Sequence, residues 1–140
     1  MKIARIVYLI TSWLFIAGVA VQVFLAGMVV VAGKMGWSSH GDLGHSLGLP
    51  LIFMLIAAYI GRLPSSMKRL TRLLLGVYIL QSDVFIFMRD SAPAISALHP
   101  VMALIDFALE LTLAVKAWSL IKQPLVDQAN ATGLKASAAD

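Results

Sequence analysis

The chain has 140 residues, of which 60% are hydrophobic and 13% charged, and its mean hydropathy is +0.89. Soluble proteins carry about 25% charged residues, so this composition excludes an ordinary soluble domain and is typical of a helical membrane protein. There are no cysteines, which excludes disulfides and thiolate-ligated zinc or iron–sulfur clusters. In a membrane protein the net charge of +4 is explained by topology signals. The loops are too short to present a basic face to nucleic acid.

Four apolar runs follow one another along the chain, each near the length that crosses a bilayer once the third is extended back a few residues. They are Ile6–Val31, Gly41–Ile60, Leu73–Met88 and Pro100–Ile121. Pro50 lies inside the second run and is expected to kink it, with neighbouring helices covering the freed carbonyl. These runs predict an all-α fold, a four-helix transmembrane bundle running up-down-up-down over residues 1–121. The polar, alanine-rich remainder, residues 122–140, is predicted to be a disordered cytoplasmic tail.

Basic residues are divided unevenly between the two sides of this bundle. The N-terminus, the middle loop and the C-terminal flank hold nine of them, whereas the other two loops hold only Lys34 and Arg89. The nine are Lys2, Arg5, Arg62, Lys68, Arg69, Arg72, Lys116, Lys122 and Lys135. The positive-inside rule therefore predicts a multi-pass protein of a bacterial cytoplasmic (inner) membrane with both termini cytoplasmic. All three histidines then lie at the outer side.

An internal repeat of two hairpins is indicated by two matched pairs. Gln22 precedes His40 by 18 residues, and Gln81 precedes His99 by the same 18, so an offset of 59 residues superposes the two pairs. Each glutamine lies in the outer half of an outgoing helix, and each histidine begins the returning helix. Because the second and fourth helices of such a bundle are diagonal neighbours, both imidazoles are expected to point at the same central space.

Three interpretations of these histidines stay open: haem ligation, helix capping, and a zinc or copper site. His40 and His99 as axial ligands would hold a haem, with Gly27, Gly41, Gly44 and Gly48 making room for the macrocycle. Alternatively each histidine caps its helix and bonds a glutamine or carboxylate. His45, which lies about 140° from His40 around the helix, is the competing ligand or faces lipid headgroups. The repeat favours His40.

An acidic stripe runs along the fourth helix from His99. At 3.6 residues per turn His99, Asp106 and Glu110 lie within about 20° of one another. Ionisable groups at membrane depth usually face a bundle interior and mark functional sites. Carboxylates at i and i+4 repel when both are ionised, so burial is expected to keep at least one protonated. Two interpretations of the pair stay open. It is a proton or cation relay leading inward from His99, or it contains a neutral carboxyl bonded to Gln22 or Gln81.

A resemblance to known families rests on four segments: VQVFLAG (Val21–Gly27), HGDLG (His40–Gly44), LQ (Leu80–Gln81) and LHPVMAL (Leu98–Leu104). Over about residues 5–120 the chain resembles an uncharacterised family of small four-span bacterial membrane proteins, which implies the fold but no activity. More loosely, it is similar to one four-helix half of haem A synthase. There, histidines near the outer ends of the second and fourth helices ligate b-type haem, and His40 and His99 match those roles by position. The glutamate that precedes a haem-site histidine in those enzymes is absent here.

These observations lead to one function hypothesis and two alternatives. The first is a b-type haem-binding electron-transfer or quinone-linked subunit of the bilayer, with His40 and His99 as ligands and Gln22 and Gln81 beside them. The second is a non-catalytic accessory or scaffold subunit that binds other membrane subunits. The third is a small proton-coupled carrier that uses Asp106 and Glu110.

The basic asymmetry makes the topology testable by reporter fusions. Fusions after Met35, near Ser66, near Ala92 and at the C-terminus are expected to report outside, inside, outside and inside. A signal from outside near Ser66 would overturn the orientation and, with it, the outer position of the histidines.

Overall fold

The computed structural model describes the backbone of residues 2–137 and the side chains of residues 2–122. Its elements are α1 (Lys2–Val30), α2 (Ser38–Ser46), α3 (Gly48–Ile60), α4 (Ser65–Ile79), the π-helical turn η1 (Leu80–Val84), α5 (Phe85–Phe87), α6 (Pro93–Ser96) and α7 (His99–Ser137). They group into four helices that are long and apolar enough to cross a membrane. The predicted all-α, four-helix bundle is therefore confirmed, and the described residues contain no strand.

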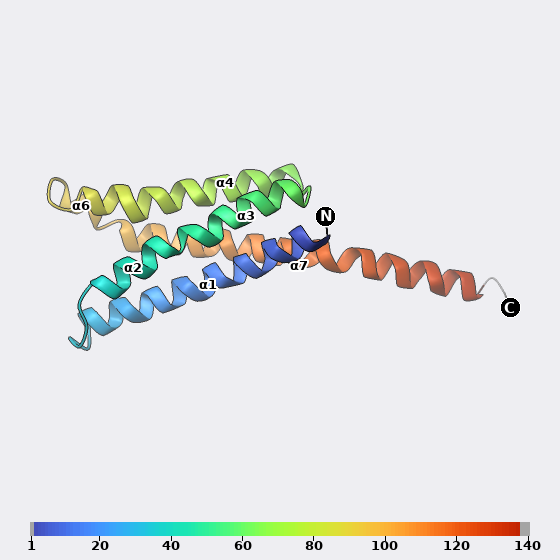
Figure 1. Cartoon of the computed structure of the whole chain (residues 1–140), viewed down its shortest axis with the longest axis horizontal. Helices are drawn as coiled ribbons and strands as arrows, with labels where there is room; N and C mark the ends of the chain where they lie inside the picture. Colours follow the sequence, from blue (N-terminus) through green and yellow to red (C-terminus); the bar gives the residue numbers. More distant parts are fainter. Residues whose placement is uncertain (1, 138–140) are drawn as a thin grey trace.

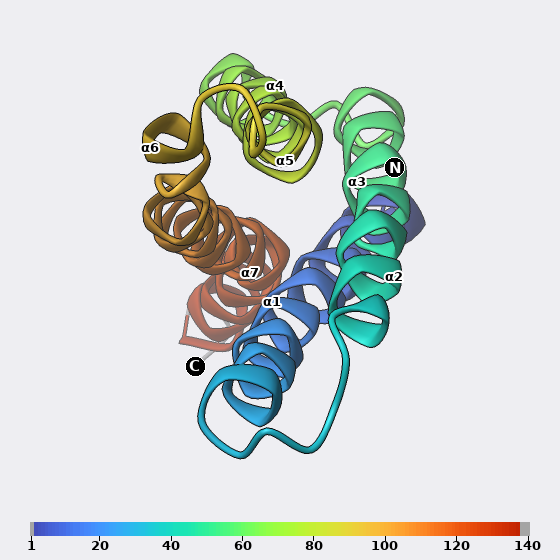
Figure 2. The ribbon, with the colours of Figure 1, turned by 90° about the vertical axis from the view of Figure 1, so that its left-hand side faces the viewer.

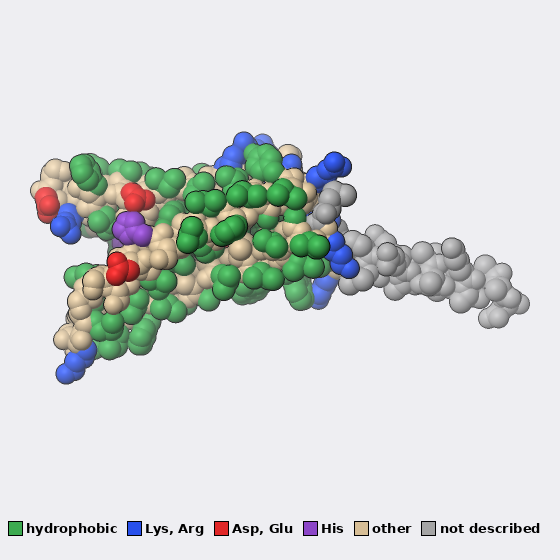
Figure 3. Space-filling model, viewed as in Figure 1, with side chains coloured by type: hydrophobic (Ala, Val, Ile, Leu, Met, Phe, Trp, Pro, Cys, Tyr) green, Lys and Arg blue, Asp and Glu red, His purple; other side chains and the backbone are tan. Residues whose placement is uncertain are grey.

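The four helices pack as a ring in which each contacts two neighbours. α1 packs against α3 and α7, and α4 packs against the same two helices. Figure 2 shows this ring, with α2–α3 and α7 on opposite sides of it. One end, which we call the histidine end, carries the α1–α2 loop and the α5–α6 connection (Figure 1). The other, the basic end, carries the N-terminus and the α3–α4 turn, and most of the visible lysines and arginines gather there (Figure 3).

Apolar side chains fill the inside of this bundle and also cover its outside. Tyr8, Phe15 and Leu51 are among the fully buried residues of the core. Large apolar side chains such as Phe24 and Leu104 are more than half exposed. Because monomeric soluble proteins rarely expose contiguous apolar surface of this extent, the arrangement is that of a membrane protein, whose outer face is solvated by lipid.

The second span is interrupted near Pro50, as the sequence predicts. α2 ends at Ser46, Leu47 lies between the two helices, and α3 begins at Gly48. Proline lacks the N–H that would bond the carbonyl four residues back. Close to this point the Tyr78 hydroxyl of α4 is within hydrogen-bonding distance of the carbonyls of Gly44 (2.5 Å) and His45 (3.2 Å). A neighbouring helix therefore supplies a donor near the kink, but to these two carbonyls and not to that of Ser46, four residues before Pro50.

The third span differs from its predicted bounds in two ways. It begins at Ser65, eight residues before Leu73, so its first turns include basic residues of the middle loop. Long basic side chains allow this because their alkyl stems lie along apolar surface while the charged ends stay in water. The span is also divided by η1, which the apolar run did not indicate.

The predicted tail, residues 122–140, lies almost entirely outside the residues whose side chains the structure describes. The backbone of α7 is helical to Ser137. The division of the chain at residue 121 stays a prediction.

The α3–α4 turn is closed by two backbone hydrogen bonds around a left-handed residue. The N–H of Leu63 bonds the carbonyl of Ala58, and that of Arg62 bonds the carbonyl of Tyr59. This is the Schellman pattern, which usually has glycine at the position that Arg62 occupies. Arg62 has φ +49°, whereas the other left-handed residue of the described backbone is Gly33, with φ +60°.

Replacing Arg62 by glycine should therefore stabilise the bundle. A side chain in the left-handed region costs about 1 kcal/mol, which Arg62→Gly removes. We expect a higher unfolding temperature in detergent, measured by circular dichroism. Arg62→Ala is the matched control, because it removes the same charge but keeps the β-carbon. Equal stability of the two variants would show that φ at this position is not what limits stability.

Candidate functional site

His40 and His99 lie next to each other at the histidine end. Their ring centroids are 6.1 Å apart with an interplanar angle of 72°, and the indole of Trp37 lies edge-on to His40 with centroids 5.5 Å apart. Both histidines are half-buried. The structure therefore brings together the two residues that the repeat made equivalent, although they come from helices on opposite sides of the ring.

Each of these histidines is held by the same hydrogen bond within its own hairpin. The Nδ1 atom of His40 lies 3.1 Å from the backbone carbonyl oxygen of Gln22, and that of His99 lies 2.8 Å from the carbonyl of Gln81. A carbonyl only accepts, so Nδ1 must be the protonated nitrogen in both neutral rings. Their Nε2 atoms then carry a free lone pair, and neither has a partner in the described part of the chain.

The π-helical turn η1 explains why the Gln81 carbonyl is available. In an α-helix the N–H of Phe85 would bond the carbonyl of Gln81, four residues back. Here it bonds the carbonyl of Leu80, five residues back. The wider turn thus releases the Gln81 carbonyl for His99. Such turns often occur at functional sites, and nothing in the sequence composition indicated this one.

The side chains of the two glutamines face the interior rather than the histidine rings. The Nε2 atom of Gln22 would lie 2.6 Å from a β-carbon placed at Gly44, so glycine is required there for the amide to fit. The Oε1 atoms of Gln22 and Gln81 are buried without a hydrogen-bond partner among the described residues. The sequence singled out both glutamines, but it is their backbone carbonyls that contact the histidines.

His45 lies on another surface of the bundle. Its Nδ1 bonds the Gly41 carbonyl of its own helix at 2.9 Å, and its Nε2 is 3.6 Å from a carboxylate oxygen of Asp83 in η1. Its side chain is 70% exposed. The structure thus places His40, and not His45, beside His99.

Asp106 and Glu110 are buried in the middle of the bundle, one helical turn apart on α7. The amide of Gln81 is the polar group beside Asp106, and the hydroxyl of Ser12 is beside Glu110. Neither contact has hydrogen-bond geometry, and all four carboxyl oxygens are without a partner among the described residues. The inward orientation expected from the stripe is thus what the structure has, and the Gln81 amide lies beside Asp106, next to one of the two glutamines expected there.

No three His, Cys, Asp or Glu side chains converge in the described part of the chain, so a metal held by the two imidazoles would have two protein ligands there. Space beside them is uneven. A β-carbon at Gly27 or Gly41 would meet no atom within 4 Å, whereas Gly44 is filled by Gln22 and Gly48 lies against Tyr78. Figure 3 shows a notch between the helices at the histidine end, with histidine colour at its inner edge.

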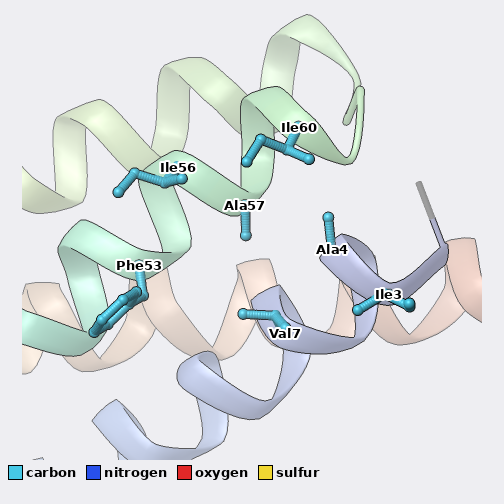
Figure 4. A pocket seen from close by; sticks show the side chains of 7 residues that line it. All are labelled: Ile3, Ala4, Val7, Phe53, Ile56, Ala57 and Ile60. Atoms are coloured by element: carbon cyan, nitrogen blue, oxygen red, sulfur yellow. The ribbon is translucent and has the colours of Figure 1, made fainter.

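An apolar groove of about 310 Å³ lies near the basic end, between α1 and α3. Its lining residues are Ile3, Ala4, Val7, Phe53, Ile56, Ala57 and Ile60 (Figure 4). They carry no ionisable or hydrogen-bonding side chain, so this groove offers packing for an apolar chain and no chemistry.

Several buried polar residues were not predicted as part of a site. The hydroxyl of Tyr8 lies 2.7 Å from that of Thr71, and Ser12 and Thr71 are both 0% exposed. In the sequence, the signal for such a buried polar residue was that Ser12 interrupts an apolar run. It did not show which polar groups meet, because that depends on how the helices pack.

Comparison with known proteins gives one match. Residues 22–85 match the model of a family described as a family of unknown function, DUF6220. No curated protein and no solved structure matches the chain. The matched segment includes Gln22, His40 and Gln81 but ends before His99 and the two carboxyls. Over somewhat less than half of its length, the chain is therefore similar to an uncharacterised family, to which no activity is attached.

Proposed function

We propose that this chain is a small integral membrane protein that binds b-type haem between His40 and His99 and serves in electron transfer. The observation that carries the proposal is the paired imidazole arrangement. Both rings donate through Nδ1 to a backbone carbonyl, and both keep Nε2 for a metal. Metal-ligating histidines are usually oriented by such a bond from their second nitrogen.

The separation of the rings supports one metal ion between them. Two imidazoles that ligate a metal from opposite sides have ring centres roughly 6 Å apart, because each metal–nitrogen bond is about 2 Å. The centroids of His40 and His99 are 6.1 Å apart. The looser likeness to half of haem A synthase points to the same pair.

Haem suits this site better than a zinc or copper ion does. A structural zinc site needs four protein ligands, whereas haem iron has four from its macrocycle and needs only axial ligands. The two imidazoles supply those, and the open space beside Gly27 and Gly41 means that neither residue obstructs a flat group. When bound, the haem supplies one-electron chemistry, and the chain's own part is to hold both rings in a fixed tautomer and spacing.

The distribution of charge suggests where such a group would work. Most basic residues lie at the end away from the histidines, so the positive-inside rule assigns the histidines to the outer side of a bacterial inner membrane, with both termini in the cytoplasm. A haem there would be placed to exchange electrons with a quinol or an extracytoplasmic donor, directly or as a subunit of a larger membrane complex.

Absorption spectroscopy tests the haem proposal. Protein purified from haem-replete cells should show a Soret band and sharp reduced α and β bands, as expected for two imidazole ligands. Either His40→Ala or His99→Ala should abolish the reduced bands. The matched control is His45→Ala, which removes an exposed histidine of the same helix as His40 and should leave the spectrum unchanged.

The same variants distinguish the second function, a colourless scaffold subunit. The two histidine–carbonyl bonds favour it, because they join helices whether or not haem binds. Each such bond is worth on the order of 0.6 kcal/mol in a membrane protein. Colourless wild-type protein whose unfolding temperature falls in both alanine variants would reject haem binding and support that alternative.

A further inference from the structure

Two carboxyl groups lie in the middle of the bundle without a hydrogen bond that meets the usual geometry among the described residues. Asp106 is 1% exposed and Glu110 is 0% exposed. None of their four oxygens has a hydrogen-bond partner among the described residues, and no lysine or arginine there forms an ion pair with them. A buried polar group without a partner costs free energy, so its presence in the interior points to a ligand or a function.

The corresponding positions of the first hairpin are apolar. The offset of 59 residues that takes His40 to His99 also takes Leu47 to Asp106 and Leu51 to Glu110. Both leucines are buried, at 7% and 0% exposure. The first hairpin therefore fills the equivalent positions with apolar side chains, and only the second hairpin places acids there.

Gln81 is an independent sign that this region binds something. It is 8% exposed, its amide lies beside Asp106, and its Oε1 atom also lacks a partner within the described residues. Three side chains thus bring unpartnered acceptor oxygens to one part of the interior. A proton is the smallest species that satisfies such oxygens, and carboxylates are the groups that bind it.

Polar groups continue from the pair toward the histidine end. Gln81 connects the two, because its side chain lies beside Asp106 while its backbone carbonyl accepts from His99. His99 is half-buried at the end where Figure 3 shows the notch. The polar side chain of Gln81 therefore extends the polar region from the carboxyl pair toward this end.

Polar groups also continue toward the basic end. The Ser12 hydroxyl is beside Glu110, and the phenol of Tyr8 is near enough to Glu110 to interact with its charge. The Tyr8 and Thr71 hydroxyls share a hydrogen bond of 2.7 Å. Hydroxyl groups both donate and accept, so they can pass a proton along.

The other ionisable groups around the pair are few. α1 contributes Tyr8, α4 contributes Tyr78, whose phenol lies near Asp106, and α7 contributes the pair itself and His99. The ionisable side chain of α3, Tyr59, is exposed and lies under Lys68. Asp83 faces the exposed His45. The carboxyls therefore have no fixed counter-charge and can alternate between neutral and anionic forms.

We propose that Asp106 and Glu110 are a proton-binding site inside the bundle, and that the polar groups on either side of it conduct protons along the bundle. On uptake an O–H bond forms on a carboxylate oxygen and the group becomes neutral. On release that bond breaks, the proton moves to the next acceptor and the carboxylate is restored. No electron moves in either step, so this activity does not depend on the haem proposed above.

Proton flux into vesicles tests this proposal. The full chain would be reconstituted in phospholipid vesicles that contain a pH-sensitive dye, and a potassium diffusion potential would drive protons inward. We expect acidification several-fold faster than in protein-free vesicles. The double variant Asp106→Leu with Glu110→Leu should reduce the rate to that of protein-free vesicles. It should still fold, since Leu47 and Leu51 fill the equivalent positions.

Three controls decide the outcome. Circular dichroism should show the double leucine variant as helical and at least as resistant to heat as the wild type, because apolar residues can replace buried charges without loss of stability. Asp42→Asn, which removes an exposed carboxyl from α2, should leave the flux unchanged. Replacing sodium by choline should also leave it unchanged. Absence of flux in the wild type, equal flux in the leucine variant, or flux that requires sodium would each overturn proton conduction, and none of them bears on the spectrum that tests haem.

Discussion

Inside a membrane there is no water to satisfy a polar group, so each one needs a partner from the protein. The bonds from His40 to the Gln22 carbonyl and from His99 to the Gln81 carbonyl meet this need at the histidine end. Each bond closes one hairpin just inside its loop, and each fixes the tautomer and direction of a ring. The proximity of the two rings follows from them, because both hairpins direct their imidazoles toward the centre of the same ring of helices.

The two hairpins share this plan but differ in the interior. Where the first hairpin has Leu47 and Leu51, the second has Asp106 and Glu110. Where α1 is continuous through Gln22, the second hairpin passes Gln81 through the π-helical turn η1. The first hairpin therefore places apolar side chains at these positions, and the second supplies the carboxyl groups of the interior. A protein built from two copies of one hairpin can acquire chemistry in one half while the other keeps the bundle stable.

Much of this arrangement could be predicted from the sequence. Hydropathy and length indicate the spans, helical periodicity places Asp106 and Glu110 on one face, and Pro50 marks the interruption between α2 and α3. The equal spacing of the glutamine–histidine pairs indicated which histidines would meet. What could not be predicted depends on three-dimensional contacts. A π-helical turn leaves no mark on composition, and a glutamine in a sequence does not show whether its amide or its carbonyl will be used.

The packing of the spans against one another could also not be predicted from the sequence. The hydroxyl of Tyr78 bonds carbonyls near the kink of another helix, and this contact appears only when the spans are packed together. The contact of Tyr8 with Thr71 joins residues 63 positions apart, and their polar pairing appears only when α1 and α4 face the same interior. Asp83 meets His45 of the other hairpin as well as its neighbour Ser82, and only the first of these contacts depends on how the spans pack.

The two histidine–carbonyl bonds have a mechanical consequence. Because each bond lies within one hairpin, each imidazole moves as a part of its own half of the molecule, and the distance between the rings reports how the two halves sit against each other. Among the described residues, the larger contacts of α2 are with α1 and α3, and those of α7 are with α1 and α4. A small rocking of one hairpin would therefore change the ring separation more readily than it would break either bond. A ligand that joined the two rings would connect the two halves of the molecule. Its binding at the histidine end would then be coupled to the alignment of the polar groups along the interior.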